Sequence, residues 1–157
     1  MERIIAKEPA VPNPYDDLKA KYDALDWKGP IDTPESIDSG CLLTFPYDYP
    51  DSDAEVVIDT DEFTAVCPWT GLPDFGMLVV RYVPNRQCIE LKSLKYYLLS
   101  YRNVGIVQEH AANRMLRDLV AISQPKRMHL KLDYKARGGI HTVVEASYDA
   151  AKGFAQS

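Results

Sequence analysis

Hydrophobic and polar positions follow two different periods along this chain of 157 residues, and each period predicts its own kind of element. The clearest strand is the run from Gly76 to Val83, which is rich in Val and ends at Pro84-Asn85. Residues 128–134 alternate between hydrophobic and polar, as is typical of a strand with one buried face. Further strands are predicted at residues 41–45, ended by Pro46, at residues 63–66, and at residues 140–148, which return as a hairpin after a turn at 137–139.

Two helices are predicted between residues 83 and 128, one over residues 92–101 and one over residues 106–122. The second has hydrophobic side chains at three- and four-residue spacing. These are Val107, Ala111, Met115, Leu119 and Ile122, with Ala112, Leu116 and Val120 widening the stripe. A short helix over residues 15–25 would place Tyr15, Leu18, Tyr22 and Leu25 on one face. The order strand, strand, helix, helix, strand, strand predicts an α+β fold, in which an antiparallel β-sheet carries both helices on one face.

The start of the chain differs in composition from the rest. Seven of the eleven prolines lie within the first fifty residues, which are also acidic. This predicts an arm over residues 1–38 and one folded domain over residues 39–157. Residues 1–62 hold 16 acidic and 5 basic side chains, a net charge of −11, whereas residues 63–157 hold 7 and 13, a net charge of +6. The basic part suits an anionic ligand such as a dinucleotide phosphate, although a solvated basic face would give the same count.

Other classes of partner are less favoured by the sequence. The basic residues are scattered rather than gathered in one stripe, so no nucleic-acid partner is expected. No hydrophobic run is long enough to cross a bilayer, and the first residues lack a signal-peptide pattern, so no membrane partner is expected. Cys41, Cys67 and Cys88 form neither a paired framework nor a metal knuckle. A cytoplasmic protein without a metal is predicted, in which a reactive thiol would survive.

The strongest candidate for chemistry is the stretch from Cys67 to Phe75, which reads Cys-Pro-Trp-Thr-Gly-Leu-Pro-Asp-Phe. It places a thiol seven residues before the carboxylic acid of Asp74, in a turn too rich in Pro and Gly to be helical. A free thiol with a pKa of about 8.5 is mostly protonated at neutral pH, so a nucleophilic cysteine needs a base, which an acid folded back by a tight loop can supply. Alternatively, Cys67 is a small buried residue and Pro73-Asp74 an ordinary turn.

Four runs follow downstream and give this stretch a context. They read Glu90-Leu91-Lys92-Ser93-Leu94-Lys95-Tyr96-Tyr97, Ser100-Tyr101-Arg102-Asn103, Gln108-Glu109-His110 and Arg137-Gly138-Gly139-Ile140. In this order and spacing, the chain resembles the short form of the NADPH-dependent 7-cyano-7-deazaguanine reductases, the nitrile reductases of queuosine biosynthesis. The resemblance covers about residues 39–148, and the Glu-x-Lys-Ser-x-Lys-x-Tyr run is its most specific part.

The resemblance implies the tunnelling fold (T-fold), which this family shares with GTP cyclohydrolase I. In that fold the sheets of neighbouring subunits close a barrel, so that their edges are paired by oligomerisation. A homo-oligomer is therefore expected, a decamer of two facing pentamers with the active sites between subunits.

The resemblance also implies roles for individual residues. Cys67 would form a covalent thioimide with the nitrile of the small-molecule substrate, and Asp74 would donate the proton. The substrate base would be bound by Ile89, Glu90, Leu91, Gln108 and Glu109, and NADPH by Lys92, Lys95 and Arg137. A carboxylate suits the N–H donors of a guanine-like edge, and two lysines near a helix start suit a phosphate. For the cofactor residues, the alternatives are a solvated helix face and a plain hairpin turn.

One position departs from the family pattern. The family commonly has His where this chain has Gln108, and Gln cannot serve as a general acid. His110 lies on the other side of Glu109, one helical step away, so the role of the histidine is not transferred to it, and a surface or intersubunit position is favoured.

Two other functions stay open at this point. A cyclohydrolase-like enzyme of the same fold would need a zinc site, for which the scattered His and Cys residues have no suitable spacing. A non-catalytic purine-binding protein would not need a paired thiol and acid.

Overall fold

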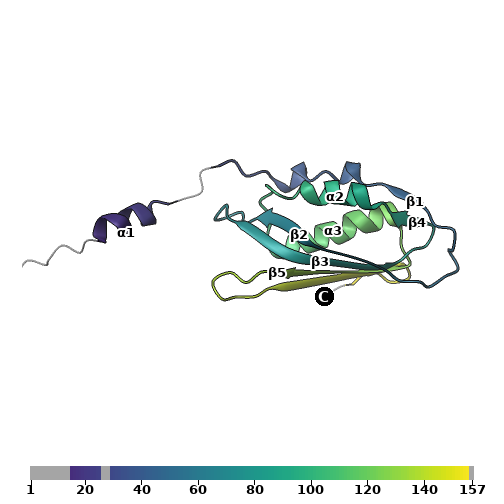
Figure 1. Cartoon of the computed structure of the whole chain (residues 1–157). Helices are drawn as coiled ribbons and strands as arrows, with labels where there is room; N and C mark the ends of the chain where they lie inside the picture. Colours follow the sequence, from purple (N-terminus) through teal and green to yellow (C-terminus); the bar gives the residue numbers. More distant parts are fainter. Residues whose placement is uncertain (1–14, 26–28, 156–157) are drawn as a thin grey trace, which may run out of the picture.

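The computed structural model describes residues 15–25 and 29–155, and its centre is a five-stranded antiparallel sheet (Figure 1). Across this sheet the strands are β2 (Val56–Val66), β3 (Pro73–Val83), β5 (Arg127–Tyr134), β6 (Val143–Asp149) and β7 (Gly153–Phe154). The helices α2 (Leu91–Leu99) and α3 (Gln108–Ser123) lie on one face of the sheet, and α1 (Asp16–Asp23) extends away from the domain. A second sheet pairs β1 (Thr44–Pro46) with β4 (Gln87–Ile89), after two short 3₁₀ helices, Pro34–Ser36 and Ser39–Cys41.

The core lies between the main sheet and the two helices α2 and α3. Every second residue of β5 is buried, namely Met128, Leu130, Leu132 and Tyr134. The facing stripe of α3 is buried too and consists of Ala111, Ala112, Met115, Leu116, Leu119 and Val120. Strand β5 and helix α3 therefore each cover the hydrophobic face of the other and shield it from water. This mutual burial is the reason why the two elements pack together.

The predicted α+β class is confirmed, and the three predicted helices are present with small shifts at their ends. The first two strand predictions need correction. β1 contains Pro46 and pairs with β4, which was not predicted, outside the main sheet. Pro is tolerated there because a strand at a sheet edge leaves one side without ladder hydrogen bonds. β2 begins at Val56 instead of Phe63, because acidic side chains interrupt its pattern and its register shifts between Thr60 and Phe63.

The chain before β1 contacts the domain at several points. Ile37 is buried in the core. Asp32 forms a parallel bridge with Val104, and its carbonyl accepts a hydrogen bond of 2.9 Å from the amide of Gly105. The carbonyl of Val104 accepts one of 3.0 Å from the amide of Val66, the last residue of β2. Three segments that are far apart in the sequence are thus joined at the end of β2.

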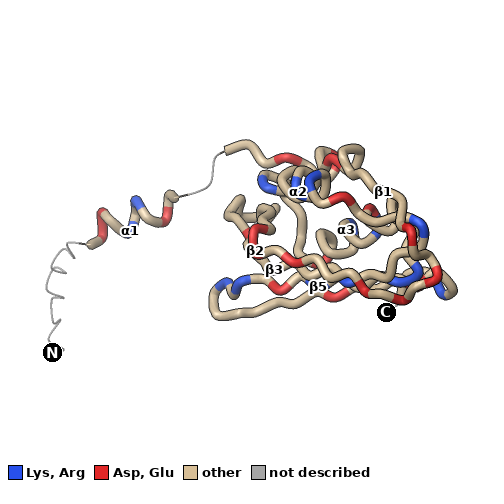
Figure 2. The backbone as a smooth tube through the Cα atoms, turned by 45° about the vertical axis from the view of Figure 1, so that its right-hand side comes forward, with Lys and Arg blue, Asp and Glu red and all other residues tan. Residues whose placement is uncertain are grey.

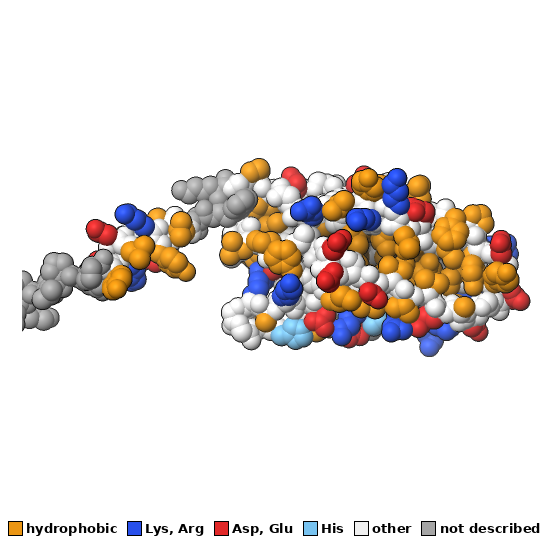
Figure 3. Space-filling view, in the orientation of Figure 1, with side chains coloured by type: hydrophobic (Ala, Val, Ile, Leu, Met, Phe, Trp, Pro, Cys, Tyr) orange, Lys and Arg blue, Asp and Glu red, His pale blue; other side chains and the backbone are white. Residues whose placement is uncertain are grey.

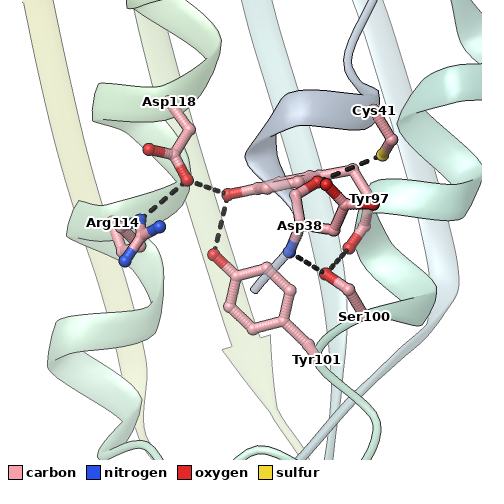
Figure 4. A network of polar contacts seen from close by, with 7 residues as sticks. All are labelled: Asp38, Cys41, Tyr97, Ser100, Tyr101, Arg114 and Asp118. Carbon is pink, nitrogen blue, oxygen red and sulfur yellow. Dashed lines mark hydrogen bonds and ion pairs between the residues drawn. The ribbon is translucent and has the colours of Figure 1, made fainter. Parts of the chain in front are cut away.

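A buried polar network joins α2 and the turn after it to α3 (Figure 4). The Tyr97 hydroxyl donates a hydrogen bond of 2.7 Å to Asp118 Oδ2 and lies 2.8 Å from the Tyr101 hydroxyl. Arg114 Nε donates to the same carboxylate oxygen at 2.8 Å. Both tyrosines are fully buried, so these contacts replace the water that their hydroxyls lose on folding. The network fixes the two helices relative to each other.

Acidic and basic positions are interspersed along the backbone of the domain (Figure 2). On the face seen in Figure 3, hydrophobic side chains gather below α2. Ile58, Leu94 and Leu98 line a groove of about 200 Å³ between α2 and β2, together with Lys95 and Arg102. In the part of the chain that the structure describes, no helix is long and hydrophobic enough to cross a membrane.

Candidate active site

The turn between β2 and β3 brings a thiol and a carboxyl to the same end of the sheet. The strands are antiparallel, with Ala65 opposite Asp74 and Val66 opposite Pro73. Residues 67–72 therefore form a tight loop that begins with the thiol and ends just before the acid. We call this segment the Cys67 loop.

Backbone hydrogen bonds hold the Cys67 loop in shape. The amide of Cys67 donates to the carbonyl of Leu72 at 2.9 Å, and the amide of Gly71 donates to the carbonyl of Cys67 at 2.8 Å. Gly71 has a φ of +70°, in the left-handed region that glycine adopts without a steric penalty. The Gly and Pro residues noted in the sequence thus allow the chain to reverse within a few residues.

Two further segments enclose a cavity of about 490 Å³ beside the thiol. The first turn of α3 contributes Gln108, Glu109 and His110, and the turn between β5 and β6 contributes Arg137. The complete lining is Cys67, Pro68, Trp69, Asp74, Val107, Gln108, Glu109, His110 and Arg137. We call this space the Cys67 cavity. Five of the ten site residues predicted from the sequence line it: Cys67, Asp74, Gln108, Glu109 and Arg137.

The thiol in this cavity is tuned toward its reactive form. Cys67 is 5% exposed, and burial alone would raise its pKa. Hydrogen bonds from the side chain and the amide of Thr70, from the Arg137 side chain and from the amide of Trp69 outweigh burial and lower the pKa of Cys67 to about 7. At neutral pH, Cys67 is therefore a thiolate more often than a free cysteine is.

The carboxyl in the same cavity is shifted in the opposite direction. Asp74 is 4% exposed, and burial raises its pKa against the opposing charge of Arg137 and a hydrogen bond from the Gln108 side chain. Arg137 Nε lies 3.0 Å from Asp74 Oδ1, but the angles do not make a hydrogen bond, so this oxygen has no hydrogen-bond partner among the described residues. A ligand in the cavity could supply the partner that a buried polar atom normally has.

Sequence reasoning missed two residues that support the site. Thr70 stabilises the thiolate. Its position three residues after Cys67 in a tight turn could have indicated this role from the sequence. Tyr134 is buried on β5, and its hydroxyl donates a hydrogen bond of 3.3 Å to the carbonyl of Gln108. Burial, and next the negative charge of Asp74, raise the pKa of Tyr134, so its hydroxyl stays protonated and keeps its role as a donor.

The predicted signature run lies elsewhere in the chain. Glu90 is the N-terminal cap of α2, and its carboxylate accepts hydrogen bonds from the amides of Lys92 and Ser93 at 2.8 and 2.7 Å. These two bonds, the one from Ser93 first, lower the pKa of Glu90. Glu90 and Lys92 line a separate cavity of about 260 Å³ with Cys41 and Tyr96. The position that looked like a ligand contact thus also starts a helix.

The neighbours of Glu90 are likewise outside the Cys67 cavity. The Ile89 side chain is buried in the core, whereas Leu91 is 59% exposed. Lys95 lines the groove between α2 and β2. A single chain therefore brings together five of the ten predicted site residues, Cys67 among them, and leaves the signature run apart from them.

A metal site would require a different arrangement. Among residues 15–25 and 29–155, no three His, Cys, Asp or Glu side chains gather closely enough to hold a metal ion. The fold defines the class of protein first: a T-fold protein, in which a thiol and a carboxyl share one cavity. A solved structure supports the fold, that of the archaeosine synthase QueF-Like in the apo form, with a TM-score of 0.58 over 63% of this chain and 96% of that chain, at 23% identity.

Sequence comparison then gives the family. A family model described as "QueF-like protein" matches residues 73–153. Curated proteins named NADPH-dependent 7-cyano-7-deazaguanine reductase, from Caldicellulosiruptor bescii and Chlorobaculum tepidum, are 54% and 55% identical over 73% and 71% of this chain, which is 88% and 95% of theirs. The relative from Thermoanaerobacter pseudethanolicus is 52% identical over 75% of this chain and 89% of its own length. The chain belongs to this family of reductases, and the resemblance found in its motifs is confirmed.

Proposed function

We propose that this protein reduces the nitrile of 7-cyano-7-deazaguanine to the primary amine of 7-aminomethyl-7-deazaguanine, with NADPH as reductant and Cys67 as nucleophile. One observation carries the proposal. A thiol with a pKa of about 7 shares a cavity with a buried carboxyl whose pKa is raised, so an anionic nucleophile and a proton donor are available together.

The first step is a covalent attack. The Cys67 thiolate adds to the nitrile carbon, so that a sulfur–carbon bond forms and one π bond of the C≡N group breaks. The electron pair of that bond moves to nitrogen, which takes the proton of the Asp74 carboxyl. The product is a thioimide on Cys67, and its C=N group accepts a hydride more readily than the nitrile does. Burial of Asp74 favours the protonated form that this step needs.

When bound, NADPH supplies the hydride for each of the two reduction steps. Lys92 and Lys95 are exposed in the first turns of α2 and carry the charge that suits its phosphates. Their cationic donors therefore fit the cofactor. In the Cys67 cavity, the carboxylate of Glu109 would accept hydrogen bonds from the N–H groups of the guanine-like ring. Gln108 would hold Asp74 in place through their hydrogen bond.

The separation of the two halves of the site supports an oligomer. We infer that the signature run of one subunit completes the Cys67 cavity of another, as expected for sites between subunits. Two exposed sheet edges, β2 and the short β7, are available for pairing with neighbours. The decamer of two pentamers and the cytoplasmic location stay predictions.

Mixed oligomers test this arrangement. Cys67→Ala and Lys92→Ala subunits are refolded together, and roughly a quarter of the sites in a random mixture then combine two intact halves. Activity above the mean of the two separate variants is expected. Activity equal to that mean would show that each chain carries its own complete site.

The reaction itself is tested by NADPH oxidation with limiting 7-cyano-7-deazaguanine. We expect two NADPH to be consumed for each nitrile, and none by Cys67→Ala. Cys88→Ala is the matched control, because Cys88 is also buried but its pKa is raised, chiefly by burial. Binding of the base without NADPH consumption by the native protein would refute the proposed reduction and favour a binding role.

A further inference from the structure

The turn between β5 and β6 gives Arg137 contacts that the family resemblance did not assign to it. Its Nε lies 3.0 Å from Asp74 Oδ1, and Arg137 lines the same cavity as Cys67, where its side chain helps to lower the pKa of the thiol. The Asp74 side chain is 3% exposed and that of Arg137 47%, so the cation reaches from the surface into the buried end of the cavity. One positive charge therefore serves both groups that the proposed chemistry uses.

We propose that Arg137 is the charge-balancing residue of the site, pairing with the Cys67 thiolate before the attack on the nitrile and with the Asp74 carboxylate after it. This inference rests on the proposed function and adds a role for Arg137 within it. NADPH is not needed for this role, which concerns the thiol, the acid and the substrate only.

The charges of the attack step lead to this assignment. In the proposed step, the negative charge lies on sulfur before the attack, and Asp74 carries the proton that it donates. When the sulfur–carbon bond forms, sulfur becomes neutral, and the electron pair of the broken π bond takes the proton from Asp74. The negative charge thus moves from Sγ to the carboxylate, and the proton moves to the nitrogen. A guanidinium beside both Cys67 Sγ and the Asp74 carboxylate keeps one ion pair in the cavity throughout the step.

Burial makes such a partner necessary. For side chains as buried as those of Cys67 and Asp74, burial without a partner favours the protonated form over the charged form. A fixed cation beside both atoms stabilises the charge where it starts and where it arrives, without reorganisation during the step. The planar guanidinium suits this position because its five N–H donors can contact two acceptors at once, which a single ammonium does less well.

The backbone holds Arg137 in place for this role. The amide of Arg137 donates to the carbonyl of Ile140 at 3.0 Å, and the amide of Ile140 donates back at 2.9 Å. Gly138 and Gly139 both have positive φ, +56° and +77°, which closes the turn within two residues. Both glycines have open space around them, so the conformation of the turn explains them better than close packing does.

Other titratable groups face the same cavity. Glu109 and His110 enter it from the start of α3, and Tyr134 lies close to Asp74 on β5. Glu109 and His110 are exposed, and Tyr134 stays protonated. Among the described residues that line the cavity, Arg137 is thus the Lys or Arg side chain that pairs with Asp74 and shares the cavity with Cys67.

The test measures the thiol separately from the reaction. The full-length protein is treated with iodoacetamide between pH 5 and 9, and modification of Cys67 is followed by mass spectrometry of its peptide. We expect Arg137→Gln to slow alkylation at pH 6 about tenfold, because a nearby opposite charge commonly shifts a pKa by about one unit or more. Arg137→Lys should restore part of the rate. Arg86→Gln is the control, because it removes the same charge from an exposed position outside the cavity.

A steady-state measurement separates this role from binding of the cofactor. Arg137→Gln should lower kcat and leave the KM for NADPH unchanged. An unchanged alkylation profile with a raised KM for NADPH would overturn the proposal and make Arg137 a phosphate-binding residue. A native protein that does not consume NADPH would refute the proposed function, whereas the alkylation profile would still test the contact between guanidinium and thiolate.

Discussion

Replacing Tyr97 by Phe should destabilise the protein while leaving the packing of the ring intact. The substitution removes one hydroxyl, which donates to Asp118 Oδ2 at 2.7 Å and pairs with the Tyr101 hydroxyl at 2.8 Å (Figure 4). Tyr97 and Tyr101 are fully buried, so water cannot reach Tyr101 to replace the lost partner. The two helices that the network joins, α2 and α3, carry most of the predicted binding residues.

The size of the effect follows from the kind of bond lost. A hydrogen bond to a charged group contributes about 1.5–3 kcal/mol to stability, and a buried group left without a partner costs more than one that water can reach. Asp118 keeps its bond to Arg114, and its side chain is 16% exposed, so water can replace part of the loss there. We therefore expect a loss of about 2 kcal/mol in the free energy of unfolding, or about 4–8 °C in Tm for a domain of this size.

The assay is urea denaturation followed by circular dichroism, at one protein concentration because an oligomer adds a dependence on concentration. Tyr96→Phe is the control, since Tyr96 lies in the same helix but is 58% exposed. Arg114→Gln in the Tyr97→Phe background should cost less than in the native protein, because both partners bond the same carboxylate oxygen. Equal stability of the two Tyr→Phe variants, or full additivity with Arg114→Gln, would refute this account of the network.

Further outcomes are expected at and near the site. Thr70→Val should slow the alkylation of Cys67 at pH 7 several-fold, because it removes a hydrogen bond that lowers the pKa of the thiol; an unchanged rate would contradict this. Gln108→Leu should lower kcat but leave alkylation unchanged, since Gln108 contacts the acid and not the thiol. Because folding lowers the pKa of Cys67 to about 7, its thiolate should add stability that grows from pH 7 to about 9 and is absent below pH 7, and the rise should vanish in Cys67→Ala. Glu90→Ala should reduce helix content at the start of α2, measurable by hydrogen exchange of the Lys92 and Ser93 amides.

Some elements were predictable because their pattern was local and uninterrupted. The period of α3 and the alternation of β5 could be read directly, since each has one hydrophobic face that the other covers. The early part of β2 could not, because Asp59, Asp61 and Glu62 lie among its residues and a register shift follows Thr60. Alternation identifies a strand only where the outward face is polar and the register is regular.

The candidate site shows the same limit. Cys67 and Asp74 could be paired from the sequence, because a short turn between two strands fixes their separation. The contacts of Arg137 could not, because they depend on how a turn more than sixty residues downstream folds over the thiol. The capping role of Glu90 could be predicted from its position before a helix, whereas the motif predicts a ligand contact for the same carboxylate.

The junction of Asp32, Val104 and Val66 has a consequence for anyone who shortens this protein. Gly105 packs so closely there that a Cβ would lie 2.8 Å from Ile31 Cγ2, so the N-terminal segment is fitted against the backbone just before the nucleophile. A protein trimmed to begin at residue 39 would lose the acceptor of the Gly105 amide and expose this backbone to solvent. Its thiol would then be expected to behave differently even if its sheet and helices formed normally. Activity measured on such a shortened form would not represent the whole chain.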